Sequence, residues 1–208
     1  MTSWAAHERA ALVDALTELG PDAPTLCDGW LTKDMAAHVY VRERRPDAAL
    51  GVLPLGPLSA YTERVMKSVL EAQGYDGLLS KLSEPAPIVR ALHIDEAINT
   101  VEFFIHTEDV RRPNKMPERE MPEEFERKIG RRMAQQGRMS FRRVGARVRL
   151  VPTVGEPAEF GKGSSLVEVH GKPSELLLLA FNRKADAKVE YTGDADAIEA
   201  LQSARLGL

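Results

Sequence analysis

The sequence predicts an α+β protein, with a helical N-terminal domain over residues 1–144 and a small C-terminal α+β domain over residues 145–208. Up to about Val144 the apolar residues recur every three or four positions, which is the spacing of packed amphipathic helices. Beyond that point apolar and polar residues alternate between Gly and Pro turns, which is typical of short strands. A chain of 208 residues is long enough for one sizeable core or two small ones, so both domains can be accommodated.

The helical part begins at Ser3, whose hydroxyl is expected to cap a helix over residues 4–19 that stops at Gly20. Thr32 is expected to cap a second helix, which ends where Pro46 disfavours a helical conformation for the residue before it. A linker is expected over residues 51–57. Further helices are predicted over residues 59–73, 76–83 and 95–111, and a long charged helix begins at Pro122.

In the C-terminal part, alternation predicts strands over residues 147–151, 166–169 and 187–191. Between the last two strands Pro173 begins an apolar helix, and Asp194 is expected to cap a final helix. A domain of roughly 60 residues buries too little apolar surface to be secure alone, so we expect it to dock on the helical domain. Arg183, at the end of the apolar helix, is then a candidate contact for an anionic ligand.

Composition and charge exclude several classes of protein. The net charge of −3 provides no overall attraction to nucleic acid or to an anionic membrane, so we expect neither as a partner. The single cysteine excludes a disulfide framework and a multi-cysteine metal site within one chain. The N-terminus lacks the pattern of a signal peptide, and the longest strongly apolar run, residues 176–181, is far shorter than the roughly 20 residues that span a bilayer. We therefore expect a cytoplasmic protein.

The predicted helix over residues 95–111 carries an unusual polar stripe. At about 100° per residue, spacings of four, three, four and three place five polar side chains on one line. They are Asp95, Asn99, Glu102, His106 and Asp109. Burying carboxylates and imidazoles is costly unless they are paired or bound to a cation, so a stripe of this kind that faces the core needs a partner.

The neighbours of the stripe indicate that it does face the core. Ile98 and Ile105 border it on one side and Phe103 on the other, whereas an ordinary surface stripe is bordered by more polar residues. A separate face of the helix, which can meet solvent, carries Glu96, Thr100 and Thr107.

His38 on the second predicted helix is a candidate partner for the stripe, because apolar residues flank it on the inner face. The opposite, more exposed face of that helix carries Ala36, Tyr40 and Glu43. His38, Glu102 and His106 then supply three nitrogen and oxygen ligands suited to Zn²⁺ or Ni²⁺. A fourth position stays open, as in catalytic zinc sites.

Three polar residues are candidates for a supporting role around these ligands. Asn99 and Asp109 lie one turn to either side of the Glu102–His106 pair and can orient the ligands by hydrogen bonding. Arg42, one turn beyond His38, is a candidate contact for an anionic substrate or a partner for Asp109.

Two segments of the sequence resemble a known family. Residues 26–39 read LCDGWLTKDMAAHV, and residues 102–110 read EFFIHTEDV. The first resembles a segment of the DinB-like, mycothiol-dependent maleylpyruvate isomerase superfamily of actinobacterial type. In that superfamily the segment begins C-x-G-W and continues to an Asp and a metal-ligating His. The second resembles that superfamily's Glu and His signature. The resemblance implies an N-terminal DinB-like four-helix bundle that binds metal through His38, Glu102 and His106, followed by a small C-terminal α+β domain.

The same resemblance implies a function. Members of the superfamily hold the thiolate of mycothiol at the open metal position, and metal coordination makes a thiol nucleophilic at neutral pH. The leading hypothesis is therefore a metal-dependent thiol transferase or isomerase that takes a small-molecule thiol and an electrophilic substrate. Cys27 is interpreted as structural, because Asp28 disfavours its thiolate and no histidine is adjacent in the sequence.

Two other interpretations stay open. One is a non-catalytic protein of the same fold that binds a metal or a small ligand. The other is a bundle whose polar stripe is only a buried hydrogen-bond network. The sequence does not indicate the reaction, the catalytic residues, the metal used in the cell, or whether the protein is a monomer or a homodimer.

Overall fold

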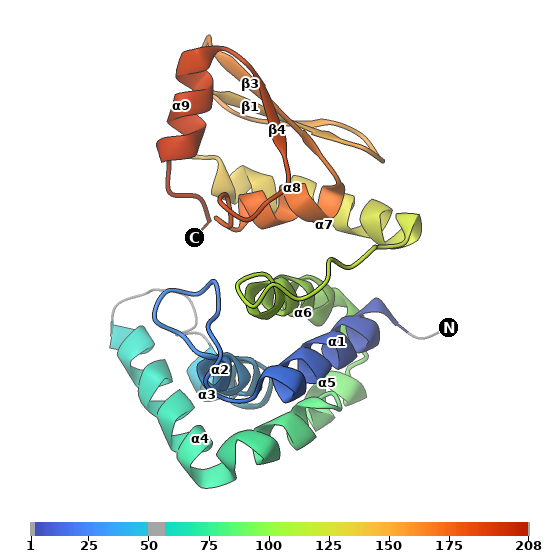
Figure 1. Ribbon diagram of the computed structural model, residues 1–208, viewed down its shortest axis with the longest axis vertical. Helices are drawn as coiled ribbons and strands as arrows, with labels where there is room; N and C mark the ends of the chain where they lie inside the picture. The colour runs from blue at the N-terminus through green and yellow to red at the C-terminus, as the bar shows by residue number, and fades with distance from the viewer. Residues whose placement is uncertain (1–2, 50–56, 208) are drawn as a thin grey trace. The chain divides into compact units, whose positions relative to one another are not determined.

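A computed structural model describes residues 3–49 and 57–207 of the chain (Figure 1). Its internal contacts divide it into two compact units, Met1–Glu118 and Arg119–Leu208. The first unit is helical and the second combines helices with a four-stranded sheet, so the predicted α+β class is confirmed. Among the described residues, no helix has both the length and the apolar character needed to cross a membrane.

The first unit is built from helices that pack around an apolar core. Helix α1 packs against α6, and α2 packs against α4. Fully buried side chains from these helices, including Leu16, Met35, Leu78 and Phe103, form the core. The helices are α1 (Trp4–Leu19), α2 (Thr32–Arg44), α3 (Pro46–Ala49), α4 (Pro57–Leu82), α5 (Pro87–Ala91) and α6 (Asp95–Arg111).

The ends of α1 follow the sequence prediction. The hydroxyl of Ser3 accepts a hydrogen bond from the backbone N–H of Ala6 at 3.1 Å, which is the contact of an N-cap. At the other end Gly20 adopts a φ of 72°, a conformation that glycine reaches without strain. Local sequence signals are therefore enough to set the length of this helix.

The start of α2 corrects one prediction. Thr32 is the first residue of the helix, and Leu31 occupies the capping position. The Asp34 carboxylate accepts the backbone N–H of Leu31 at 2.9 Å, and the Thr32 hydroxyl donates to the carbonyl of Gly20 instead. Thr32 therefore ties the entry of α2 to the end of α1.

Helix α4 contains the two helices that were predicted over residues 59–73 and 76–83. Gly74 lies between them with a φ of 67° and a ψ of 167°, so the helix bends at this residue, as Figure 1 shows. Residues 51–56 of the predicted linker lie outside the described residues, and Pro57 begins α4. Helices α3 and α5 were not predicted, because four and five residues are too few to display a helical period.

The second unit contains a mixed sheet. Its strand order is β2-β1-β3-β4, with β1 and β3 parallel and both edge strands antiparallel to their neighbours. The elements are α7 (Glu123–Ser140), β1 (Arg147–Pro152), β2 (Ala158–Gly161), β3 (Leu166–Gly171), α8 (Pro173–Ala180), β4 (Glu190–Gly193) and α9 (Ala195–Ser203).

The core of the second unit lies on one face of this sheet. Val148 pairs with Val167 and Leu150 with Val169 in the parallel register, so the four side chains share a face, and all are fully buried. Helices α8 and α9 both contact β1 and β3. The leucines of α8, Leu176 to Leu179, are also fully buried. An apolar helix over an apolar sheet face therefore provides the core.

Several predictions for this region differ from the structure. The units divide after Glu118 and not after Val144, the predicted boundary. The reason is that α7 packs against α8. Glu126 of α7 also accepts hydrogen bonds from the backbone N–H and hydroxyl of Ser174, at 2.8 and 2.7 Å.

The strands and the last cap also differ in detail. Strand β2 was not predicted, and β4 begins three residues later than the predicted start at residue 187. Asp194 precedes α9 as expected, but its carboxylate accepts the backbone N–H of Leu166 at 2.8 Å and does not cap the helix. The carboxylate therefore joins the start of α9 to strand β3.

Candidate metal centre

The polar stripe of α6 is buried, as the sequence pattern predicted. Asn99 and Asp109 are fully buried, His106 is 9% exposed, and Glu102 keeps 21% of its side chain accessible. The prediction that Thr100 and Thr107 meet solvent is wrong, because both are buried in a helix that packs along α1. Each threonine hydroxyl donates to a carbonyl one turn earlier, which satisfies it within the helix.

Three side chains from α2 and α6 converge near the middle of the stripe. Oε1 of Glu102 lies 3.2 Å from Nε2 of His106 and 3.6 Å from Nε2 of His38. The two imidazole rings are 5.0 Å apart and nearly perpendicular, and potential ligand atoms of all three residues lie within 4.8 Å of one another. A tetrahedral ion with bonds of about 2.0 to 2.1 Å holds nitrogen and oxygen ligands about 3.3 Å apart. The distances from Glu102 to the two imidazole nitrogens therefore fit a zinc-sized ion.

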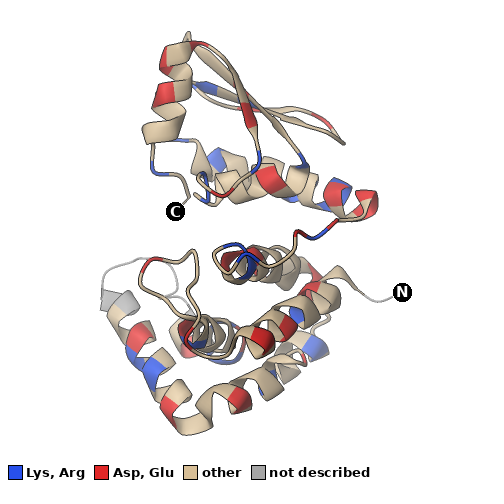
Figure 2. Ribbon diagram, in the orientation of Figure 1, with Lys and Arg blue, Asp and Glu red and all other residues tan. Residues whose placement is uncertain are grey.

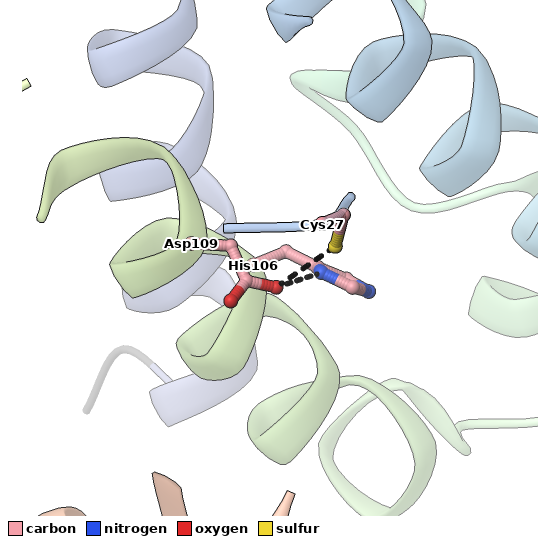
Figure 3. A group of neighbouring side chains, drawn as sticks. All are labelled: Cys27, His106 and Asp109. Carbon is pink, nitrogen blue, oxygen red and sulfur yellow. Dashed lines mark hydrogen bonds and ion pairs between the residues drawn. The ribbon is translucent and has the colours of Figure 1, made fainter. Parts of the chain in front are cut away.

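The other nitrogen of His106 faces a different pair of side chains (Figure 3). Oδ2 of Asp109 lies 2.9 Å from Nδ1 of His106 and 3.5 Å from Sγ of Cys27. The loop before α2 brings Cys27 to this position, because the backbone N–H of Leu26 donates to the carbonyl of Asp109 at 2.9 Å. The residues adjacent to Cys27 in the sequence carry no signal of this contact, because Asp109 lies 82 residues away along the chain.

The same loop supplies an aromatic neighbour. The ring of Trp30 lies 4.9 Å from the ring of His38, at an interplanar angle of 53°. Both residues belong to the segment that begins at Leu26, and His38 is only 6% exposed. The loop and the start of α2 thus cover the imidazole of His38.

Arg42 contacts a different carboxylate from the one suggested by the sequence. Its Nε lies 2.9 Å from Oε1 of Glu102, and its Nη1 donates to Oδ1 of Asn99 at 2.7 Å. The predicted pair with Asp109 is therefore wrong. Asn99 acts on Glu102 through Arg42, while Asp109 acts on His106 directly.

A second buried polar cluster supports the start of α6. Nη2 of Arg9 lies 2.6 Å from Glu43 and 2.7 Å from Asp95, and Nδ2 of Asn99 donates to both carboxylates. Ala36 and Glu43 were predicted on an exposed face of α2, but both are buried. A buried carboxylate is tolerated here because Arg9, from α1, neutralises it.

The electrostatics of the three candidate ligands differ. Burial lowers the pKa of His38 because it disfavours the charged ring. Burial opposes ionisation of Glu102, but hydrogen bonds to His106 and His38 hold the pKa of its carboxyl well below the usual range. Burial also opposes charge on His106, yet hydrogen bonds, above all that to Asp109, raise its pKa well above the usual value. At neutral pH the side chains are therefore a neutral His38, an ionised Glu102 and a protonated His106.

The remaining candidate, Arg183, belongs to the second unit, whereas the other predicted site residues belong to the first. Its guanidinium donates a hydrogen bond to the carbonyl of Phe181. An anion contact at this residue stays a prediction.

The arginines of α7 and of the sheet are mixed with acidic residues. Arg127 pairs with Glu123 within α7, and Arg149 pairs with Glu168 across the sheet. Figure 2 shows acidic and basic residues together along α7. This arrangement resembles a solvated helix surface more than a single-sign binding patch.

Comparison of the chain with protein-family models, with curated protein sequences and with solved structures found no match.

Proposed function

We propose that this protein is a metal-dependent thiol transferase or isomerase of the mycothiol type, in which His38, Glu102 and His106 hold Zn²⁺ or Ni²⁺. The observation that carries the proposal is the convergence of these three side chains, from two helices, to within 4.8 Å. Three protein ligands with an open position are typical of catalytic zinc sites and not of structural ones.

The reaction class comes from the resemblance of residues 26–39 and 102–110 to the DinB-like superfamily. On that basis the first unit corresponds to the superfamily's metal-binding four-helix bundle, and the protein acts in the cytoplasm on a small-molecule thiol and an electrophilic substrate. When bound by three ligands, such an ion supplies an open position at which a thiol is deprotonated at neutral pH.

The chain's own residues prepare the site for that chemistry. Asp109 accepts a hydrogen bond from Nδ1 of His106, so Nε2 is the ligand atom once the metal has displaced its proton. Arg42 lies 2.9 Å from Oε1 of Glu102 and adds positive charge that favours the ionised carboxylate. Trp30 packs against His38 and limits the access of water to its ring.

Metal content is the first test. The full chain, purified without a metal-chelating tag and analysed for elements, is expected to carry about one divalent ion per chain. His38→Ala and His106→Ala should each lose most of it while the helical circular dichroism is retained, because the apolar core of the unit is separate from the ligands. His7→Ala is the matched control, since His7 is exposed on α1. Full metal content in both ligand variants contradicts the assignment.

A thiol-transfer assay then separates the remaining alternatives. The metal-loaded chain is mixed with mycothiol and several electrophiles, and loss of free thiol is followed. Turnover that disappears in His106→Ala supports the enzyme. A bound metal without turnover identifies a non-catalytic binding protein. A chain that binds no metal leaves a hydrogen-bond network, from Arg42 through Glu102 and His106 to Asp109, as the role of the stripe.

A further inference from the structure

The imidazole of His106 has a carboxylate at each nitrogen. Glu102 lies 3.2 Å from Nε2, and Asp109 lies 2.9 Å from Nδ1. Each carboxylate has a further metal-ligating neighbour, His38 beside Glu102 and Cys27 beside Asp109. Two groups of potential ligands therefore lie on opposite edges of one ring, and they share only His106.

The distances in the second group fit a metal ion. Sγ of Cys27 lies 3.5 Å from Oδ2 of Asp109, Nδ1 of His106 lies 2.9 Å from the same oxygen, and ligand atoms of all three residues lie within 4.8 Å of one another (Figure 3). A tetrahedral ion with a metal–sulfur bond of about 2.3 Å places sulfur about 3.6 Å from the other ligand atoms. It places nitrogen and oxygen ligands about 3.3 Å apart, so His106 and Asp109 need to separate by a few tenths of an ångström.

The surroundings hold these groups in place. Asp109 is fully buried, and its own carbonyl accepts the backbone N–H of Leu26 at 2.9 Å. The next residue along the loop is Cys27, whose backbone N–H donates to the hydroxyl of Thr25 at 3.2 Å. The half-buried thiol is thus fixed to α6 by its own loop. A pre-organised cysteine sulfur, imidazole and carboxylate favour a thiophilic ion over a hard one.

We propose that Cys27, His106 and Asp109 form a second metal position, for a thiophilic divalent ion, that is mutually exclusive with the position at His38 and Glu102. As the ion binds, a metal–sulfur bond and a metal–nitrogen bond form, and the thiol proton of Cys27 and the Nδ1 proton of His106 leave to solvent. A neutral imidazole has one nitrogen lone pair, so His106 serves one position at a time. Whichever nitrogen binds, the N–H of the other donates to a carboxylate, as is usual for metal-bound histidines. This inference needs no catalytic activity and does not depend on His38, so it stands apart from the proposed function.

Cadmium is the probe, because a cadmium–thiolate bond gives a near-ultraviolet charge-transfer band. Titration of the full wild-type chain, which has a single cysteine, and of His38→Ala should produce this band, saturating at about one Cd²⁺ per chain. Cys27→Ser should not produce it. Absence of the band from both wild type and His38→Ala overturns the second position.

Mutual exclusion has its own test with Ni²⁺. Prior loading of wild type with Ni²⁺ should suppress the cadmium band, whereas the same treatment of His38→Ala should leave most of it. A band that grows fully in nickel-loaded wild type overturns the exclusivity. If His38→Ala keeps the wild-type affinity for Ni²⁺, the site of the proposed function fails, and the cadmium result for the second position is unaffected.

Alkylation of Cys27 provides a test that needs no variant to fold. Iodoacetamide modifies the single cysteine, and mass spectrometry follows the rate on the native chain. Saturating Cd²⁺ should slow the reaction at least about tenfold, because a coordinated thiolate is no longer a free nucleophile. An unchanged rate at saturating Cd²⁺ contradicts coordination by Cys27.

Discussion

Helices α6 and α8 are both buried, but α8 buries mainly leucines, whereas α6 buries a polar stripe beside its apolar side chains. In α8 the fully buried residues are the consecutive leucines 176–179 and Ala180, in a helix that lies over an apolar sheet face. In α6 they include Asn99 and Asp109. Burying a leucine contributes about 1.5 to 3 kcal/mol, whereas burying an ionic group costs several kcal/mol unless it is paired. Helix α8 therefore stabilises its unit. Helix α6 contains polar side chains whose burial is destabilising, and partners from α1, α2 and the loop before α2 offset that cost.

The largest effect is expected where one of those partners is removed. Arg9→Met leaves Glu43 as a buried, uncompensated carboxylate and should reduce the free energy of unfolding by about 3 to 5 kcal/mol. Urea unfolding followed by tryptophan fluorescence measures it, because Trp4 and Trp30 both lie in the first unit.

Two further variants test whether the loss of stability comes from the unpaired charge of Glu43. Arg9→Met combined with Glu43→Met should recover more than half of the loss, because no buried charge remains between the two positions. Arg64→Met on the exposed side of α4 is the control. If the single Arg9 variant loses less than about 1 kcal/mol, Glu43 is not a buried charge that depends on Arg9.

The apolar helix should respond to a loss of volume and not to a loss of charge. Leu178→Ala removes a fully buried side chain and should cost about 3 kcal/mol, through lost apolar burial and the cavity that remains. Urea unfolding followed by far-ultraviolet circular dichroism reports it. Met139→Ala in the same unit, at a side chain that is 41% exposed, should change stability much less. Equal losses in the two variants argue against a tightly packed core around α8.

A smaller effect is expected from the residue that orients His106. Asp109→Asn keeps the shape of the side chain but removes the negative charge beside Nδ1, and should weaken Zn²⁺ binding about 10- to 100-fold. Competition with a chelator measures the affinity. Asp22→Asn is the control, since Asp22 is exposed and forms a surface ion pair with Lys33. Unchanged affinity in Asp109→Asn shows that Asp109 has only a structural role.

The smallest effect is a dependence of metal affinity on pH. Because the pKa of His106 is raised, the ring is protonated at neutral pH, and a metal ion must displace that proton. Glu102 is already ionised and His38 already neutral there, so neither adds a proton. Zn²⁺ affinity should therefore rise by at most about tenfold per pH unit above neutral, until the pH passes the pKa of His106. Chelator competition across that range measures the slope, and a flat profile means that His106 is unprotonated in the metal-free chain.

The sequence predicted much of the architecture, because the signals for it are local. Helix α6 has the predicted bounds, since its apolar period and its flanking residues are visible in one segment. The inward orientation of His38 and His106 followed from the same periodicity. Strand β2 was missed because four residues give too short an alternation to recognise.

Other features could not be predicted in this way. The burial of Glu43 depends on Arg9, which lies 34 residues away along the chain. The sequence pattern predicts that Thr100 and Thr107 are exposed, but α1 packs against α6 and both residues are buried. In each case a polar residue is buried because a distant segment compensates for its cost, and periodicity carries no information about that segment.

The sequence by itself determined the α+β class, the main helices, and the two segments that carry His38 and the Glu102–His106 pair, because helical period and capping act over a few residues. Only the tertiary structure decided which side chains meet. It joined Arg42 to Glu102 and not to Asp109, and it brought Cys27 to a carboxylate 82 residues away. The reason is physical: a buried charge takes whichever partner the packing of the helices brings within hydrogen-bond distance, and that packing depends on the whole core.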